Sequence, residues 1–563
     1  MKSSIYMAFM VLVAFCQYNA ESIEVRVTLD GGDATGVYSE DGGVDTAFEG
    51  KIKTDAGKVE VKLKRSETRR LGEKFETGST DLALKKHGMF TNSVASSLLQ
   101  LSPPDKSEWK TNVPKPYWEG HDDVVKCFAH ALEVTGREYL HDPESGSGFT
   151  RRFVYTPFGS SVFMWGNCYI TMWGRYASHL FEFIDMLDNF YGKQSRDGFI
   201  PRQIDIRNGQ STFEKNDLSG SGGNLLAWAE WRNYEWTGET NRLSKAYPSL
   251  LAFHRWLRTN RTWKDGTYFS SGWGCGMDNI PRFKGDVAHS HGHISYVDVT
   301  LQQAFNAKLL LKIAEVLKTD EGVIELKEEY RKLERIANKR MWDEAAGVYK
   351  DLDADGNRVS CSHIGTYWAL LAGIANSNRV ERLADNALDP KRFAAACGLA
   401  STSIDDPGFV ADGGNYWAGG CWCIMDYSAA KGFESVGRAD IAHVIARRAV
   451  EAVARVYTQT GAIWESYSPT EKAPGKNWGH RVRKFIGFSG TVPVALFFEN
   501  VLGVQVEGPH RIVWDFRLKE SHGIENLVLA DGNRVSLRYD AATDKSTWTS
   551  ERPVEVIVKK NHR

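Results

Sequence analysis

The sequence predicts a mainly α-helical protein in which a large helical domain lies between two small β-rich regions. From about residue 115 to 503, segments with helical spacing of apolar residues alternate with loops rich in Gly, Pro and Asn. We count about eleven or twelve such segments, and no strand pattern alternates with them. Paired helices in that number predict a toroid of two concentric helical rings. The expected boundaries are 21–110 for the N-terminal β-rich region, 111–505 for the helical domain and 506–563 for the C-terminal β region.

The first twenty residues have the pattern of a secretory signal peptide. Lys2 supplies a positive charge, and residues 5–15 form an apolar run that is too short to span a bilayer. We expect the signal peptide to occupy residues 1–20, with Ala20 at the cleavage site. No later apolar run reaches the roughly 18 residues that a membrane helix needs. The sequence therefore predicts an exported protein without a membrane span, periplasmic or extracellular.

Alternating apolar residues predict short strands near both ends of the chain. Residues 22–70 show this alternation, interrupted by Gly-Gly and Asp-Gly pairs that are typical of turns. The same pattern returns from about residue 508, with Asp531-Gly532 as a turn. The clearest predicted strands are 23–27, 59–63, 512–516, 535–537 and 554–558.

Two of the predicted helices have a complete helical repeat of apolar residues. One runs from Leu301 to Leu317, with an apolar residue at every fourth position. The other runs from Ile441 to Val456, and Gly461 is expected to end it.

Composition excludes several classes of function. The chain has 70 Lys+Arg against 71 Asp+Glu, a net charge of −1, so it has no overall positive field for a nucleic acid backbone. Aromatic residues make up 12% of the chain, which suits both a large core and stacking on sugar faces. Seven cysteines remain after signal cleavage, an odd number over more than 540 residues, so we expect buried free thiols and not a disulfide framework.

The loop 271–282, with the sequence SGWGCGMDNIPR, is the first candidate site. Its glycines allow close approach of the backbone. Asp278 follows Met277 and lies near Trp273, an apolar setting that would raise the pKa of its carboxyl group and keep it protonated. A protonated carboxylic acid among aromatic side chains is what glycosidic bond cleavage requires of its general acid. A turn-capping aspartate is the alternative interpretation.

The second candidate is Glu465 in the segment 461–469, GAIWESYSP, which is followed by GFSG at 487–490. Glu465 lies between Trp464 and Tyr467, just past the end of a predicted helix. Taken alone, such a glutamate is more often a surface carboxylate.

Six segments in this order resemble bacterial glycoside hydrolases of family 63, nearest to the mannosylglycerate hydrolase-like and trehalase-like group. The resemblance extends from about Trp118 to Phe516. The segments are FMWGNCYITMWGRYA (163–177), DGFIPRQI (197–204), LLAWAEWRNYEWTGE (225–239), the loop SGWGCGMDNIPRF, DPGFVADGGNYWAGG (406–420) and IWESYSP with the following GFSG.

The resemblance implies an (α/α)6 toroid and an inverting hydrolase that cleaves an α-glycosidic bond of an α-glucoside, α-mannoside or related oligosaccharide. By the same resemblance, Asp278 is the general acid and Glu465 the general base. It implies a carbohydrate substrate and no metal, nucleotide or redox cofactor.

The same motifs supply the residues that we predict to bind substrate. Tryptophans beside glycine-rich loops favour an aromatic sugar site, and arginines bind sugar hydroxyls or carboxylates. The predicted substrate-binding residues are Trp165, Asn167, Arg202, Trp273, Asn279, Arg282, His293, Trp417, Trp464 and Tyr467.

Three segments depart from the family pattern. Trp165-Gly166-Asn167 stands where relatives often have a Trp-Asp pair, Ala418 stands where they have an arginine, and residues 421–426 replace a segment that usually carries Pro and Asn. These changes predict a substrate that differs from plain glucose or mannose units. They also leave two alternatives open, a catalytically inactive carbohydrate-binding protein on the same fold and a polysaccharide lyase, since lyases also use helical toroids.

Two further patterns suggest metal sites but favour other interpretations. The run His289-x-His291-x-His293 lacks the H-E-x-x-H order of a zinc helix, so substrate-site lining or helix entry is the better interpretation. The run Asp351-x-Asp353-x-Asp355 resembles the start of a calcium loop, but its twelfth position is Ser362 instead of glutamate. We expect a hairpin turn there.

Overall fold

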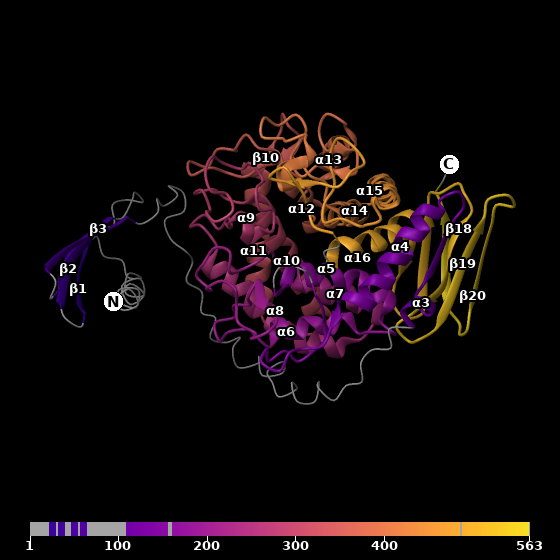
Figure 1. The fold of residues 1–563 in the computed structure, drawn as a ribbon, viewed down its shortest axis with the longest axis horizontal. Helices are drawn as coiled ribbons and strands as arrows, with labels where there is room; N and C mark the ends of the chain where they lie inside the picture. Colours follow the sequence, from indigo (N-terminus) through magenta and orange to yellow (C-terminus); the bar gives the residue numbers. More distant parts are fainter. Residues whose placement is uncertain are drawn as a thin grey trace.

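The structure is a computed structural model that describes residues 22–29, 32–39, 47–54, 57–64, 108–155, 160–484 and 487–561 (Figure 1). The predicted signal peptide, residues 1–20, lies outside the described residues. The domain boundaries given above stay predictions.

The N-terminal region contains the β-structure that its alternating sequence predicts. Four strands, β1 (Ser22–Leu29), β2 (Gly32–Ser39), β3 (Ala47–Thr54) and β4 (Gly57–Lys64), form one sheet. Each strand pairs antiparallel with the next along the chain, as expected for strands joined by short turns.

Among the described residues, six helices form a closed inner ring. Each helix contacts the next one along the chain, and the sixth contacts the first, so the ring closes. The inner helices are α5 (Met164–Gly174), α7 (Leu226–Thr237), α10 (Val297–Leu317), α12 (Trp368–Ala372), α14 (Cys423–Ser435) and α16 (Gly487–Leu496).

A second layer of helices packs against the outside of this ring. For example, α15 packs on α14, α11 packs on α10, and α8 packs on both α7 and α10. The outer layer contains α4 (Asp122–Val134), η4 (Phe183–Leu187) with α6 (Asp188–Tyr191), α8 (Thr240–Asn260), α11 (Val323–Ile336), α13 (Ser377–Leu388) and α15 (Ala439–Thr460). The predicted toroid of two concentric helical rings is confirmed.

Burial explains why inner and outer helices differ in sequence. The inner helix α14 is covered on nearly all sides and consists largely of apolar and small residues. The outer helix α13 buries only Val380, Leu383, Ala384 and Ala387, a stripe at helical spacing, and its other face is polar. Both helices with complete apolar repeats are confirmed as α10 and α15, and Gly461 ends α15 with a left-handed φ of 68°.

The C-terminal β region consists of two sheets. Strands β16 (Val504–Val506), β17 (Arg511–Phe516) and β21 (Glu555–Lys560) form one, and β18 (His522–Val528), β19 (Arg534–Asp540) and β20 (Lys545–Ser550) belong to the other. The second sheet also includes β5 (Lys115–Trp118), so the start of the helical domain pairs with the end of the chain (Figure 1). The predicted turn at Asp531-Gly532 joins β18 to β19.

Short elements connect the helices, and most of the candidate site residues lie in the loops between the named elements. They are α3 (Glu108–Thr111), η2 (Thr135–Tyr139), β6 (Leu140–His141), β7 (Phe153–Val154), β8 (Ser161–Phe163), η3 (Arg175–Ala177), β9 (Gln203–Asp205), α9 (Gly272–Cys275), η5 (Ala337–Met341), β10 (Trp342–Asp343), β11 (Val348–Tyr349), η6 (Ile364–Tyr367), β12 (Ala394–Ala395), β13 (Gly398–Leu399), η7 (Gly413–Ala418), β14 (Lys476–Asn477), β15 (His480–Arg481) and η8 (Phe497–Val501).

The cysteines in the described residues are all buried free thiols, as the sequence predicts. Within the same residues, none of the helices is long and apolar enough to cross a membrane.

Candidate active site

The loop that carries Asp278 is shaped by a capped turn and a close packing contact. Ser271 accepts a hydrogen bond from the N–H of Gly274 at 3.0 Å and so caps the short helix α9. Gly276 ends this helix with a φ of 81°, and a Cβ atom there would lie 2.9 Å from the ring of Trp165. Only glycine meets both demands, so the loop is fixed against Trp165 two residues before Asp278.

Asp278 is half-buried, and its surroundings raise the pKa of its carboxyl group toward neutral pH. Burial raises the pKa of its carboxyl group to about 6, while the nearby charges of Arg202 and His289 oppose the rise. Burial also lowers the pKa of the Arg202 guanidinium to about 10. The raised carboxyl pKa that the sequence predicts for Asp278 is therefore present in the structure.

Glu465 is buried and not the surface carboxylate that its sequence context favours. Its side chain is only 4% exposed. Oε1 accepts a hydrogen bond from the hydroxyl of Tyr416 at 2.7 Å, and Oε2 accepts a longer one from the backbone N–H of Arg483 at 3.4 Å. The N–H of Glu465 donates in turn to the carbonyl of Arg483 at 2.9 Å, so backbone contacts fix the position of Glu465.

The two carboxyl groups interact electrostatically although they come from loops far apart in sequence. Burial raises the pKa of Glu465 to about 7, the Tyr416 hydroxyl and Arg483 lower it, and the charge of Asp278 raises it further. Coulombic coupling of this kind requires the two groups to be near each other in a setting that screens poorly. Asp278 and Glu465 are therefore close enough for the charge of one to act on the pKa of the other.

Tyr416 belongs to this site, and the sequence analysis did not identify it. Gly414, Asn415 and Tyr416 have φ values of 76°, 35° and 66°. The left-handed region is unfavourable for residues other than glycine, by about 1–3 kcal/mol each, and such strain occurs mainly at functional sites. The preceding Gly413-Gly414-Asn415 run was the signal for this conformation, since glycine and asparagine tolerate it best.

Asn279 ties the Asp278 loop to the strained segment. Its Nδ2 donates to the carbonyl of Asn415 at 2.9 Å, and its Oδ1 accepts from the N–H of Trp417 at 2.8 Å. The amide therefore bonds on both sides of Tyr416, whose hydroxyl reaches Glu465. Asn279, a predicted substrate-binding residue, uses its amide on protein backbone and holds the acid and base loops together.

The predicted aromatic substrate-binding residues separate into two groups. Trp165 and Trp273 keep some exposed surface, and Trp273 contacts the His289 ring near Asp278 at 4.3 Å. The others are at most 5% exposed and pack within the loops: Trp417 stacks on Trp422 at 4.0 Å, Trp464 bonds Thr460, and the Tyr467 hydroxyl accepts from the N–H of Trp464.

Asn167 and His293 do not have the surroundings expected of sugar-binding residues. Asn167 lies in the inner helix α5 with no exposed surface, and its Nδ2 donates to the carbonyl of Phe163. Because α5 is covered by α7 and α16, a substrate hydroxyl does not reach this amide in the structure. In the histidine run, the residue whose charge acts on Asp278 is His289, whereas His293 packs edge-on against His291.

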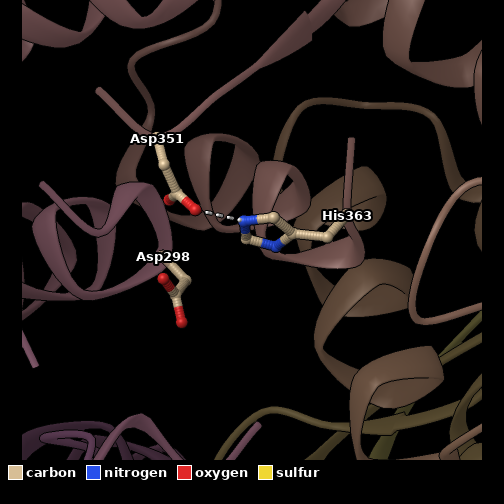
Figure 2. A group of neighbouring side chains, drawn as sticks. All are labelled: Asp298, Asp351 and His363. Atoms are coloured by element: carbon tan, nitrogen blue, oxygen red, sulfur yellow. Dashed lines mark hydrogen bonds and ion pairs between the residues drawn. The ribbon is translucent and has the colours of Figure 1, made fainter. Parts of the chain in front are cut away.

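Arg282 forms a buried ion-pair cluster and does not face a substrate. Figure 2 shows Asp298, Asp351 and His363, whose ligand atoms lie within 4.8 Å of one another as in a metal site. The Arg282 guanidinium donates to Asp351 and to Asp298 at 2.9 Å each, and all of these side chains are fully buried. This guanidinium already supplies the positive charge that a metal ion would bring to the two carboxylates, so we interpret the cluster as structural. The predicted role of Arg282 in substrate binding is thus corrected by its burial.

The segment that begins at Asp351 was predicted to form a hairpin turn and not a calcium loop. Although burial alone would raise its pKa, Arg282 and His363 lower it to about 2. The residues that follow form a turn, in which Asp353 and Gly356 share a backbone hydrogen bond and Leu352 pairs with Arg358. The hairpin turn expected there is confirmed.

Comparison with known proteins shows which family the chain is similar to. The profile of the mannosylglycerate hydrolase MGH1-like glycoside hydrolase domain matches residues 184–485, which include Asp278 and Glu465. A protein of Borreliella burgdorferi of uncharacterised function is 26% identical over 429 residues, covering 75% of this chain and 88% of that protein.

One further relative and one solved structure are also similar to this chain. A Schizosaccharomyces pombe protein described as a probable mannosyl-oligosaccharide glucosidase is 26% identical over 287 residues, 48% of this chain and 34% of that protein. The solved structure of a family 63 mannosylglycerate hydrolase from Thermus thermophilus, in complex with Tris, has the same fold with a TM-score of 0.53 and 21% identity, covering 66% of this chain and 99% of that chain.

The family profile spans more than half of the chain and contains both carboxyl groups of the site. The fold comparison agrees with the closed double ring of helices. The chain therefore belongs to the mannosylglycerate hydrolase MGH1-like glycoside hydrolase family and is a glycoside hydrolase built on an (α/α)6 toroid.

Proposed function

We propose that this glycoside hydrolase cleaves an α-glycosidic bond with inversion, and that Asp278 and Glu465 are its acid and base. The observation that carries the proposal is the pair itself. Two carboxyl groups on separate loops interact electrostatically, both have a raised pKa, and one of them is held by the hydroxyl of Tyr416. Groups that exchange protons near neutral pH suit general acid and general base catalysis.

The mechanism transfers one proton to the sugar and removes one from water. Asp278 donates its proton to the glycosidic oxygen as the bond to the anomeric carbon breaks. Glu465 takes a proton from a water molecule whose oxygen attacks the anomeric carbon on the opposite face. The product has the inverted anomeric configuration, and afterwards the proton rests on Glu465 and returns to Asp278 through solvent.

The contacts of the two groups distinguish their roles. Burial raises the pKa of both carboxyl groups toward neutral pH, so each can exchange a proton there. The hydrogen bonds from Tyr416 and the Arg483 N–H stabilise the charged form of Glu465, which supports its role as base. Leaving-group dependence tests this assignment of roles.

The test is hydrolysis of a panel of α-linked disaccharides and oligosaccharides, with the first product anomer followed by NMR. Inversion gives the β-anomer first. If Asp278 is the acid, Asp278→Asn retains the most activity on aryl glycosides with good leaving groups, because these need little protonation. An α-anomer, an unsaturated product as from a lyase, or no hydrolysis of any glycoside would each refute the proposal.

The pH profile should show both carboxyl groups of the free enzyme. We expect a bell-shaped dependence of kcat/KM on pH, because the active enzyme has one proton on the Asp278–Glu465 pair. Its two sides should fall near the pKa values of these two groups. Tyr416→Phe removes the hydrogen bond that lowers the pKa of Glu465, so the limb that belongs to Glu465 should move to higher pH. Measuring kcat/KM from about pH 4 to about pH 9 checks this. A profile of Tyr416→Phe that coincides with that of wild type would contradict the role of Tyr416.

Export is part of the proposal. It rests on the charged and apolar pattern of residues 1–20, which is typical of a secretory signal peptide.

A further inference from the structure

A hairpin beside the base loop concentrates positive charge in a protein that is otherwise balanced. The segment 472–484 contains no Asp or Glu, whereas the whole chain has a net charge of −1. Its backbone forms β14 and β15, joined by the turn Trp478-Gly479. Its positively charged residues are Lys472, Lys476, Arg481, Arg483 and Lys484.

This hairpin lies directly against the proposed catalytic groups. The backbone of Arg483 exchanges hydrogen bonds with Glu465, and Lys484 pairs with Trp464. At the turn, the N–H of Trp478 donates to Oδ1 of Asn415 at 2.9 Å. Asn415 precedes Tyr416, so the hairpin contacts both Glu465 and the residue next to the tyrosine that bonds it.

Trp478 is exposed to an extent that folding does not explain. Its side chain is 79% exposed, more than any other large hydrophobic side chain in the described residues. Its φ of 50°, followed by 80° at Gly479, places both turn residues in the left-handed region. Such two-residue turns normally use Asn or Gly, so a tryptophan there combines backbone strain with exposed apolar surface.

Most of the positive charges near Trp478 are not neutralised by carboxylates. Lys476 pairs with Asp412. Arg481 and Lys484 instead lie over the ring of Trp464, at 5.9 and 5.6 Å. Within the described part of the chain, neither has a carboxylate at ion-pair distance, and both are exposed, as is Lys472. Exposed cations beside an exposed ring are therefore available to a ligand.

We propose that this hairpin binds a glycan chain that carries negative charge, as uronate carboxylates or sulfates, and continues the substrate site outward from Glu465. The ring of Trp478 would stack on the apolar face of one sugar unit. Arg481 and Lys484 would pair with acidic groups of the chain, where guanidinium suits carboxylate and sulfate geometry. Trp478 lies at the turn of the hairpin and Lys484 at its other end beside Trp464, so the ring and the cations offer separate contacts along a glycan chain.

The inference rests on the proposed function, because the glycosidase site beside the hairpin makes a glycan the expected occupant. A basic strand with an exposed aromatic ring is also compatible with single-stranded nucleic acid. The near-zero net charge and the position of the hairpin beside Glu465 favour the glycan.

The test is binding of α-linked oligogalacturonate to the full-length protein, measured by isothermal titration calorimetry at low salt. Its methyl ester, which has the same backbone without charge, is the neutral probe. Wild type should bind the acid form at least about tenfold more tightly than the ester, and salt should weaken this binding because it screens exposed charges. Trp478→Ala and the double variant Arg481→Ala/Lys484→Ala should each weaken binding about tenfold, equivalent to one lost stacking or charge contact.

Matched controls separate this site from general effects of charge and aromatic surface. Trp548→Ala removes another exposed tryptophan, on β20, and Lys327→Ala/Arg331→Ala removes two exposed cations on α11. Both should bind as wild type does. A dextran sulfate and dextran pair repeats the comparison for sulfate, and a positive result with either acid supports the proposal.

Several outcomes would overturn the inference. Equal binding of acid and ester, binding of neither acid probe, or tighter binding of oligothymidylate than of both acidic glycans would each do so. Binding to the hairpin is compared between acid and ester whether or not the bound chain is hydrolysed, so the result does not depend on turnover. A protein that binds the acidic chain but hydrolyses no glycoside would refute the catalytic proposal alone.

Discussion

Glu465→Gln is expected to lower kcat on an unactivated α-glycoside by about 10²–10⁴-fold, the usual contribution of a general base. The amide keeps the shape of the side chain but cannot take a proton from the attacking water. Asp278→Asn should cause a loss of the same order on substrates with poor leaving groups. Steady-state kinetics on the substrate identified by the panel checks both variants.

The thermal stability of Glu465→Gln distinguishes a loss of catalysis from a loss of folding. A buried carboxyl group whose folded-state pKa is raised destabilises the fold once pH exceeds its unfolded pKa, and this effect is complete above the folded value of about 7. Glu465→Gln should therefore have a Tm at about pH 8 equal to or above that of wild type, with a smaller difference at about pH 5. The matched control is Glu471→Gln, an exposed glutamate in the same loop. Near-wild-type kcat in Glu465→Gln, or a Tm far below wild type at the higher pH, would contradict the assignment.

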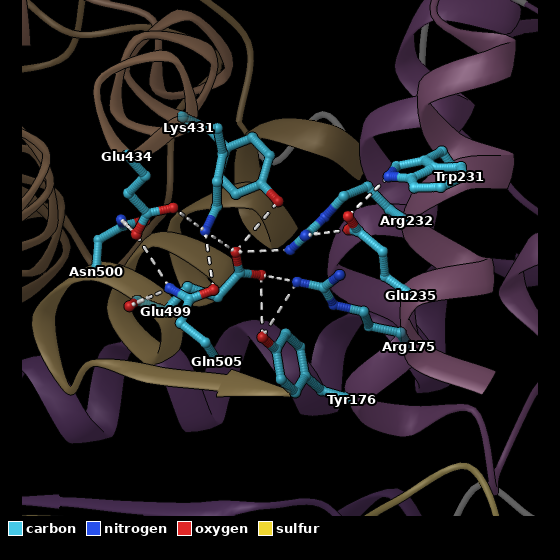
Figure 3. Close-up of polar contacts among 11 residues, drawn as sticks. Arg175, Tyr176, Trp231, Arg232, Glu235, Lys431, Glu434, Glu499, Asn500 and Gln505 are labelled. Atoms are coloured by element: carbon cyan, nitrogen blue, oxygen red, sulfur yellow. Dashed lines mark hydrogen bonds and ion pairs between the residues drawn. The ribbon is translucent and has the colours of Figure 1, made fainter. Parts of the chain in front are cut away.

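Glu499→Gln is expected to destabilise the fold by about 3–5 kcal/mol, the usual loss when one partner of a buried ion cluster is removed. Glu499 of η8 has no exposed side-chain surface and pairs with Arg175, Arg232 and Lys431. Figure 3 shows the three cations converging on this carboxylate from different elements of the toroid, and Tyr176 adds a hydrogen bond at 3.0 Å. Without the carboxylate, two buried cations and the half-buried Arg232 lose their common partner.

The pH dependence of this loss has a definite sign. Burial alone would raise the pKa of Glu499, but Arg175, Lys431 and Arg232 lower it to about 2. A lowered pKa gives stability that is present above the unfolded value and lost as pH falls toward the folded one. Denaturant unfolding should therefore show a large difference between wild type and Glu499→Gln at about pH 7 that shrinks below about pH 4. Glu507→Gln, at an exposed glutamate near this cluster, should change stability little. A loss of similar size in both variants would refute the role of the cluster.

The sequence by itself predicted the helical architecture, and its family resemblance indicated the two candidate carboxyl groups. Helical spacing of apolar residues is a local property, so α10 and α15 were predicted with their ends nearly correct, and Gly461 ended α15 because glycine accepts a left-handed φ. The apolar surroundings of Asp278 are also local, since Trp273 and Met277 are its neighbours in the chain. For that reason its raised pKa was predictable.

Tertiary structure alone decided which polar groups meet. Arg282 and Asn279 are both polar residues close to Asp278 in sequence. Arg282 is buried against Asp298 and Asp351. Asn279 instead bonds the backbone on both sides of Tyr416. Tyr416 reaches Glu465 because the loops before α14 and α16 pair through Cys421 and Tyr467, and Asn279 bonds on both sides of the strained residue. These contacts join residues that are far apart in the chain, so no local pattern encodes them. The packing of the helices into a ring fixes the positions of the loops and therefore which side chains meet.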